Sequence, residues 1–151
     1  MAQSLAQVHL HLVFSTKNRV ASFRDTRIRN ELHAYLAAAF KAQGAPAHTI
    51  GGTSDHLHVL FGLPRDCEIA SLVANVKRNS SIWIKTKGPA YGSFHWQNGY
   101  GVFSVSHSHV DKVAAYVRDQ DTHHRRLSFQ DEYRSLLRKH GVQFDERYVW
   151  D

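Results

Sequence analysis

The sequence predicts an α+β fold, with a ferredoxin-like or RRM-like β-α-β-β-α-β antiparallel sheet and an additional helix on its C-terminal side. Three observations lead to this prediction. Short segments rich in β-branched and aromatic residues alternate with longer segments whose apolar residues recur at helical spacing. Two strand segments follow each other with only a turn between them, and the last third of the chain has helical patterns. This order is typical of a sheet whose helices pack on one face.

The four strand segments differ in pattern. Residues 8–16, VHLHLVFST, alternate into a β-branched and aromatic run. Residues 45–52 and 56–64 form a pair around the turn GGTSD, and Pro64 ends the second of them. The fourth segment, residues 93–106, is aromatic and extended but is interrupted by QNG. In the predicted topology the first and third strands lie at the centre of the sheet.

The helical segments are residues 25–44, 68–88, 108–124 and 128–141. Apolar side chains line one face of each of the first three, as in the first: Ile28, Leu32, Leu36 and Phe40. The two C-terminal segments each begin with a capping box, Ser108 with Asp111 and Ser128 with Asp131. Glycine follows three of the four segments, where a C-terminal helix cap favours it.

Length and composition indicate one globular domain, residues 1–151, with its own core. No apolar run is long enough to span a membrane, and the N-terminus lacks a signal-peptide pattern. The single cysteine, Cys67, fits a reducing compartment, so we expect a cytoplasmic protein without a membrane partner. The formal net charge of +6 favours polyanions, and it makes nucleic acid the class of partner to consider.

The third strand contains the stretch SDHLHVLF, with His56 and His58 one residue apart. Residues two apart share one face of a strand, so the two imidazoles lie side by side. Such a pair is half of a metal site, although an isolated pair at this spacing more often consists of two ordinary histidines on a wet sheet face. Three more histidine pairs occur: His9 with His11, His107 with His109 and His123 with His124. The pair at 9 and 11 is an alternative metal-binding pair. The pair at 107 and 109 is explained by solvated residues at a helix cap. The pair at 123 and 124 is explained either by cations at a helix C-terminus or by contacts with phosphate.

Tyr116 and Gln120 are four residues apart on the third helical segment, and they therefore share one helical face at the edge of its apolar stripe. The amide oxygen of glutamine can coordinate a hard cation, and tyrosine offers a phenolic oxygen. A solvated helix flank gives the same pattern, so the spacing alone does not decide between the two interpretations.

Five motifs occur in order: HLVFSTKNR (11–19), DHLHVLF (55–61), WQNGYGVFSVS (96–106), YVRDQ (116–120) and DERYVW (145–150). Together they resemble the single-tyrosine HUH transposases of the insertion-sequence 200/605 family, over about residues 7–150. HUH stands for His-hydrophobic-His. The resemblance implies that His56, His58 and Gln120 bind a divalent metal, Mg²⁺ or Mn²⁺. It also implies that Tyr116 is the nucleophile, which makes its helix the catalytic helix.

What the resemblance implies about activity is specific. Members of the family are small homodimers that cleave and rejoin single-stranded DNA at insertion-sequence ends, recognise subterminal hairpins and form a 5′-phosphotyrosine intermediate. In such a dimer we expect the tyrosine helix to dock on the partner chain, with SVSHSH (104–109) as the connecting segment. The alternatives are a domesticated repeat-associated tyrosine transposase that processes genomic palindromes, and a non-catalytic nucleic-acid-binding module.

The DNA-binding candidates are basic residues near the first strand, on the second helix and beside the tyrosine: Lys17, Arg19, Lys77, Arg78, Lys85, Lys112 and Arg118. A charged helix face is also commonly just solvated. Aromatic residues available for base stacking are Trp83, Tyr91, Trp96 and Tyr100.

Overall fold

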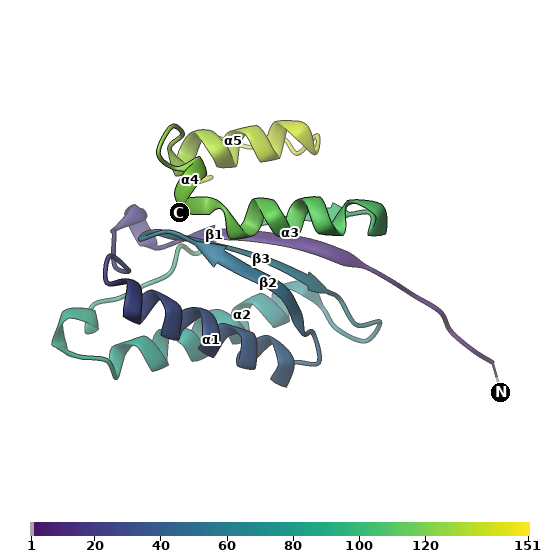
Figure 1. Cartoon of the computed structure of the whole chain (residues 1–151), viewed down its shortest axis with the longest axis horizontal. Helices are drawn as coiled ribbons and strands as arrows, with labels where there is room; N and C mark the ends of the chain where they lie inside the picture. Colours follow the sequence, from purple (N-terminus) through teal and green to yellow (C-terminus); the bar gives the residue numbers. More distant parts are fainter. Residues whose placement is uncertain (1) are drawn as a thin grey trace.

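The computed structural model describes residues 2–151, and its centre is a four-stranded antiparallel sheet. The strands are β1 (His9–Ser15), β2 (Ala47–Gly52), β3 (His56–Gly62) and β4 (Gly101–Val105). Their order across the sheet is β2-β3-β1-β4, so β1 and β3 are central (Figure 1). The predicted α+β fold is confirmed.

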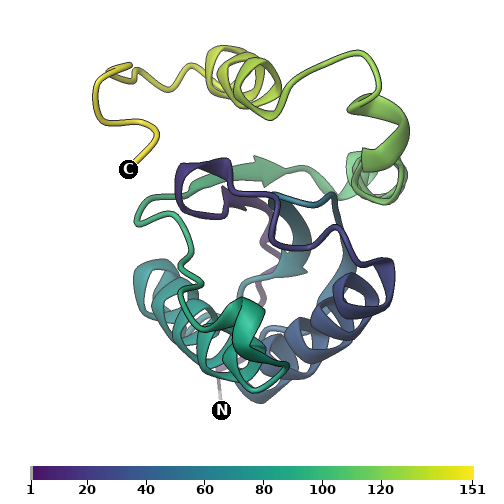
Figure 2. The ribbon, with the colours of Figure 1, turned by 90° about the vertical axis from the view of Figure 1, so that its left-hand side faces the viewer.

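Helices α1 (Thr26–Ala42) and α2 (Ile69–Lys85) cover one face of the sheet (Figure 2). The main core lies between them and the strands, and from β3 it receives Leu57, Val59 and Phe61. The predicted apolar stripe of α1 is fully used, because Ile28, Leu32, Leu36 and Phe40 are all buried. Because strand side chains alternate between faces, the remaining β3 residues point to the opposite side.

The C-terminal helices α3 (Val110–Arg118), α4 (Gln120–His123) and α5 (Phe129–Lys139) cover that opposite face, so the sheet lies between two helical layers (Figure 1). The sequence predicted one continuous helix over 108–124. Instead, a short 3₁₀ turn, η3 (His107–His109), precedes α3, and the chain turns at Asp119 between α3 and α4. The Ser108 capping box does not form, because the N-cap of α3 is His109. The Ser128 box does form, with the Asp131 amide donating to Ser128 Oγ at 3.1 Å.

Two glycines allow the C-terminal helices to approach the sheet closely. A Cβ at Gly51 of β2 would lie 1.8 Å from the backbone oxygen of Val117 in α3. A Cβ at Gly101 of β4 would lie 2.8 Å from the ring of Tyr133 in α5. Any larger residue at these positions would therefore push the corresponding helix away from the strands.

The predicted fourth strand is shorter than expected, because only Gly101–Val105 pair with β1. The preceding segment is irregular and contains η2 (Pro89–Tyr91), with one isolated bridge between Thr16 and Trp96. The Lys77 ammonium group donates to the backbone oxygens of Gln97 and Gly99, at 2.6 and 2.7 Å. The remaining short element is η1 (Lys17–Arg19). Within residues 2–151, no helix is long and apolar enough to cross a membrane.

Candidate active site

The face of the sheet beneath the C-terminal helices carries two pairs of histidines on the central strands. His56 and His58 lie on β3 and are completely buried, and His9 and His11 lie on the neighbouring β1. Leu57 and Val59 point into the core on the other side. Because successive side chains of a strand point to opposite faces, the two histidines of β3 lie on one face and its apolar residues on the other.

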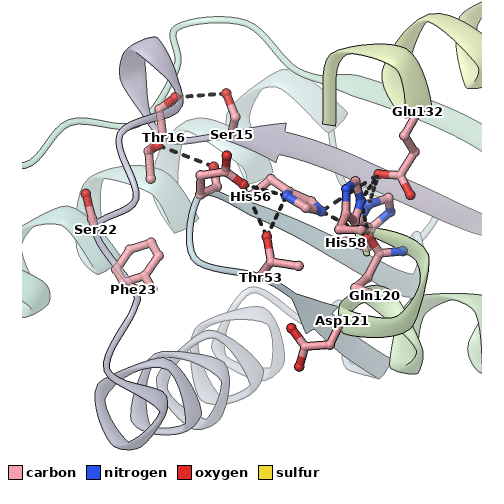
Figure 3. A network of polar contacts seen from close by, with 12 residues as sticks. Ser15, Thr16, Ser22, Phe23, Thr53, His56, His58, Gln120, Asp121 and Glu132 are labelled. Carbon is pink, nitrogen blue, oxygen red and sulfur yellow. Dashed lines mark hydrogen bonds and ion pairs between the residues drawn. The ribbon is translucent and has the colours of Figure 1, made fainter. Parts of the chain in front are cut away.

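Gln120 and Glu132 approach the His56–His58 pair from the helices above (Figure 3). Gln120 Oε1 lies 2.9 Å from His56 Nε2, and Glu132 Oε1 lies 2.9 Å from His58 Nε2. The same Glu132 oxygen is 3.7 Å from His56 Nε2. The structure thus brings together the three residues expected as metal ligands, and it adds a carboxylate.

Glu132 was not predicted from the sequence, and it lies 74 residues from His58 along the chain. It was missed because an acidic residue in the first turn of a helix is usually explained by the helix dipole. The signal that identifies it is its place on the apolar face of α5, among Phe129, Tyr133 and Leu137, where it is only 1% exposed. Glu132 therefore adds an acidic side chain to the imidazoles of His56 and His58 and the amide of Gln120.

The donor atoms suit a divalent cation. One atom each from His56, His58 and Glu132 lie within 4.8 Å of one another. Burial lowers the pKa of His58 to about 4, with Glu132 opposing the shift, so this imidazole is neutral at pH 7. Burial alone would raise the pKa of Glu132, but hydrogen bonds from His124 and His58 bring it well below its usual range. Neutral imidazoles and an ionised carboxylate are the protonation states in which these groups bind metal.

Each of the two histidines also makes a polar contact through Nδ1, on the side of the ring away from the cluster. Asp55 Oδ1 lies 2.8 Å from His56 Nδ1, and Thr53 Oγ1 lies 3.0 Å from it. His11 Nε2 lies 2.7 Å from His58 Nδ1. Asp55, in the turn between β2 and β3, thus orients His56 through its side chain. Nε2 of both rings is consequently directed at Gln120 and Glu132.

Tyr116 of α3 reaches the same carboxylate. Its hydroxyl donates to Glu132 Oε2, and its ring lies 5.8 Å from that of His58. Burial and the charge of Glu132 raise the pKa of Tyr116, so the phenol is protonated at rest. Gln120 Nε2 donates to the Tyr116 backbone oxygen at 3.2 Å, which leaves its Oε1 directed at His56. All these groups belong to one chain, so a single chain can bring the tyrosine to the histidine pair; the exchange of the tyrosine helix between chains stays a prediction.

Comparison with known proteins places the chain in a family. The family model described as "Transposase IS200 like" matches residues 4–120, which is most of the chain. The chain belongs to this family. The matched range ends at Gln120, so α5 and Glu132 lie beyond it.

Solved structures show the same fold. A protein from Deinococcus radiodurans R1 described as a transposase is similar with a TM-score of 0.63 and 22% identity, over 80% of this chain and 95% of that one. A REP-associated tyrosine transposase bound to a REP hairpin has a TM-score of 0.54 and 12% identity, over 78% of this chain and 70% of that one. No curated protein matches the sequence significantly.

The other histidines of the transposase are distributed around this centre. His9 lies on the same face but outside the cluster, and it pairs with His107, with 3.0 Å between Nε2 and Nδ1. His109 pairs with Ser106 at 2.7 Å. The sequence left two interpretations of His124, a cation at a helix end and a contact with phosphate. In the structure His124 points inward, and its Nε2 lies 3.1 Å from Glu132 Oε1. His123 packs its ring against Tyr116.

The basic residues expected to contact DNA lie on several surfaces. Lys112 and Arg118 are exposed on the tyrosine helix. Lys77, Arg78 and Lys85 belong to α2, on the opposite side of the sheet. Burial lowers the pKa of Lys77 to about 8, and its ammonium group already binds backbone oxygens.

The two basic residues that follow β1 differ in their surroundings. Lys17 is exposed, whereas Arg19 donates to the Trp150 backbone oxygen at 2.8 Å. DNA contact by any of the basic residues stays a prediction. Of the aromatic candidates, Trp96 is a core residue, and Trp83 stacks on Tyr35.

Proposed function

We propose that this IS200-like transposase cleaves and rejoins single-stranded DNA through a 5′-phosphotyrosine at Tyr116. A divalent metal, Mg²⁺ or Mn²⁺, would be held by His56, His58 and Gln120, with Glu132 as an additional ligand. The observation that carries the proposal is the convergence on Glu132: one oxygen faces the histidine pair, and the other accepts the hydrogen bond of the tyrosine. A nucleophile and a cation-binding cluster therefore meet at a single carboxylate.

The residues divide the reaction between them. When bound, a divalent ion would withdraw charge from the scissile phosphate. Tyr116 Oη forms the bond to phosphorus, its proton passes to Glu132 Oε2, and the 3′ oxygen of the DNA leaves and takes up a proton from water. In the reverse step a DNA 3′-hydroxyl attacks phosphorus and gives its proton to water, and the departing tyrosine oxygen takes back the proton held by Glu132 Oε2. The phosphoester is exchanged rather than hydrolysed, so rejoining needs no ATP.

The DNA we propose is a single strand with subterminal hairpins, bound by a homodimer. The net charge of +6 supports a polyanionic ligand, and one structural relative is itself bound to a REP hairpin. That relative also supports a second candidate of the same chemistry, a domesticated transposase that processes genomic palindromes. The two candidates differ in substrate: the first would cleave insertion-sequence ends, and the second would process palindromes of the genome.

The nucleophile is tested with single-stranded oligonucleotides from the DNA flanking the gene, labelled at the 3′ end so that a 5′-phosphotyrosine retains the label. With Mn²⁺, the wild type should give a labelled protein band on a denaturing gel. Tyr116→Phe should give none while still binding the DNA, because only a hydroxyl is lost. Tyr100→Phe, on the loop before β4, is the matched control and should retain the band. An adduct that persists in Tyr116→Phe would exclude this tyrosine.

A further inference from the structure

We propose that His11 is a positioning residue for the metal centre: it fixes the ring orientation of His58 and accepts the hydrogen bond from His58 Nδ1 when Nε2 binds a cation. The inference rests on the proposed function in requiring that His58 binds a cation through Nε2. It assigns a role to a histidine that is neither a ligand in the cluster nor in contact with Glu132 through a hydrogen bond.

The two rings meet across the central strand pair. His11 of β1 is opposite Leu60, and His58 of β3 is opposite Val13, so the two histidines are diagonal neighbours on one face. Their ring centroids are 5.0 Å apart, and the 2.7 Å contact joins His11 Nε2 to His58 Nδ1. Both side chains are buried, with 3% and 0% exposure. A contact between two buried groups on adjacent central strands has little freedom to rearrange.

The direction of this hydrogen bond follows from the chemistry of imidazole. A neutral ring has one N–H, and it binds a cation only through its other nitrogen. Since His58 Nε2 faces Glu132 and the cluster, a bound cation requires the proton of His58 to be on Nδ1. His58 Nδ1 then donates and His11 Nε2 accepts, which places the proton of His11 on its own Nδ1. His11 thus supplies the acceptor that favours the metal-binding tautomer.

The other ligand histidine provides an internal comparison. His56 Nδ1 has an anionic acceptor, Asp55, whereas His58 Nδ1 has only a neutral imidazole. The ring of His11 is packed edge-on against Phe103 and Tyr116, at centroid distances of 6.3 and 6.1 Å. This packing holds the acceptor in place from the side of β4 and from the side of α3.

The first experiment measures binding of Mn²⁺ alone, by electron paramagnetic resonance or calorimetry, without DNA. His11→Leu removes the acceptor and should weaken Mn²⁺ binding about 10- to 100-fold, as is usual for such outer-shell partners. His11→Gln can present an amide oxygen near the former Nε2, and it should stay close to wild type. His9→Leu is the matched control, on the same strand and face but paired with His107, and it should bind as wild type. Equal affinity in His11→Leu and wild type, or equal weakening in His11→Gln and His11→Leu, would overturn the proposal.

The second experiment needs no variant, so it decides the question even if His11→Leu fails to fold. Nitrogen-15 NMR of the wild type loaded with Zn²⁺ should show the His58 proton on Nδ1 and the His11 proton on Nδ1. A His11 proton on Nε2 in the loaded protein would overturn the inference. Neither experiment depends on DNA cleavage, so a Tyr116→Phe variant that still forms adducts would contradict the proposed function and leave these results unaffected.

Discussion

Glu132 changes the charge of the candidate centre, because it adds a carboxylate to two imidazoles and an amide. Anionic ligands raise the affinity for divalent cations. Glu132→Gln should therefore weaken Mn²⁺ binding by at least about tenfold. It should reduce cleavage at saturating Mn²⁺ as well, since the amide cannot accept the proton of Tyr116. Glu146→Gln, on the exposed C-terminal segment, is the control and should change neither quantity in a metal titration followed by a cleavage assay.

His56 and His58 should be indispensable for metal binding. His56→Ala and His58→Ala should each abolish Mn²⁺ binding and cleavage, and a chelator should do the same to the wild type. Gln120→Ala should weaken both without abolishing them, because water can replace a neutral amide ligand. His9→Ala should leave both intact, since His9 pairs with His107 outside the cluster. Loss of cleavage in His9→Ala with retention in His56→Ala would show that the metal pair is on β1.

A half-buried histidine outside the site makes stability depend on pH. His33 of α1 has its Nε2 buried without a protein hydrogen-bond partner, and burial together with Arg29 lowers its pKa from 6.5 to about 4. The unfolded chain therefore binds a proton first, and the free energy of unfolding falls as the pH drops from 6.5 towards 4. At about pH 5 this contributes a loss of roughly 2 kcal/mol. Urea unfolding of His33→Gln should show a smaller loss than the wild type between about pH 7 and pH 5; an identical loss would contradict the assignment.

At the scale of elements, the parts predicted well are those with a strong local pattern. The alternation in β3 and the four-residue spacing in α1 each give the element and its buried face. The break at Asp119 was missed because the residues around it continue a helical pattern, and the turn is needed to bring Gln120 back to His56. Glu132 could not be paired with His58 from the sequence, because only the docking of α5 on the second face of the sheet brings them together.

The docking of α3 depends on Gly51, where a Cβ would lie 1.8 Å from the Val117 oxygen. Gly51→Ala should displace the helix and with it Tyr116 and Gln120, at a cost of about 1–3 kcal/mol in stability. Adduct formation should fall strongly, while DNA binding should be less affected. Gly62→Ala is the matched control on β3, since its Cβ would meet its nearest neighbours only at 3.9 Å. Thermal unfolding and the adduct assay together check both variants; an active Gly51→Ala would show that α3 need not sit so close.

At the scale of the molecule, the C-terminal helices are fixed to their own chain at several points. Helix α3 packs closely on Gly51, and α5 packs closely on Gly101. Arg29 of α1 pairs with Asp121 of α4 at 3.3 Å. The last contact joins the two helical layers around the β2 edge. These contacts support a prediction of assembly in cis, whereas the family resemblance led us to expect exchange between chains.

Mixed dimers test this arrangement, with two affinity tags used to isolate heterodimers. In a heterodimer of His56→Ala and Tyr116→Phe chains, cis assembly leaves one lesion in each pocket, so the dimer should be inactive. In a heterodimer of a wild-type chain and a chain carrying both substitutions, cis assembly leaves one intact pocket, so adducts should form at about half the wild-type level, if the two pockets act independently. Assembly in trans reverses both results, because the first dimer then gains an intact pocket and the second has a lesion in each. We expect activity only in the second dimer, because α3 packs closely on Gly51 and Asp121 of α4 pairs with Arg29 when a chain folds on itself.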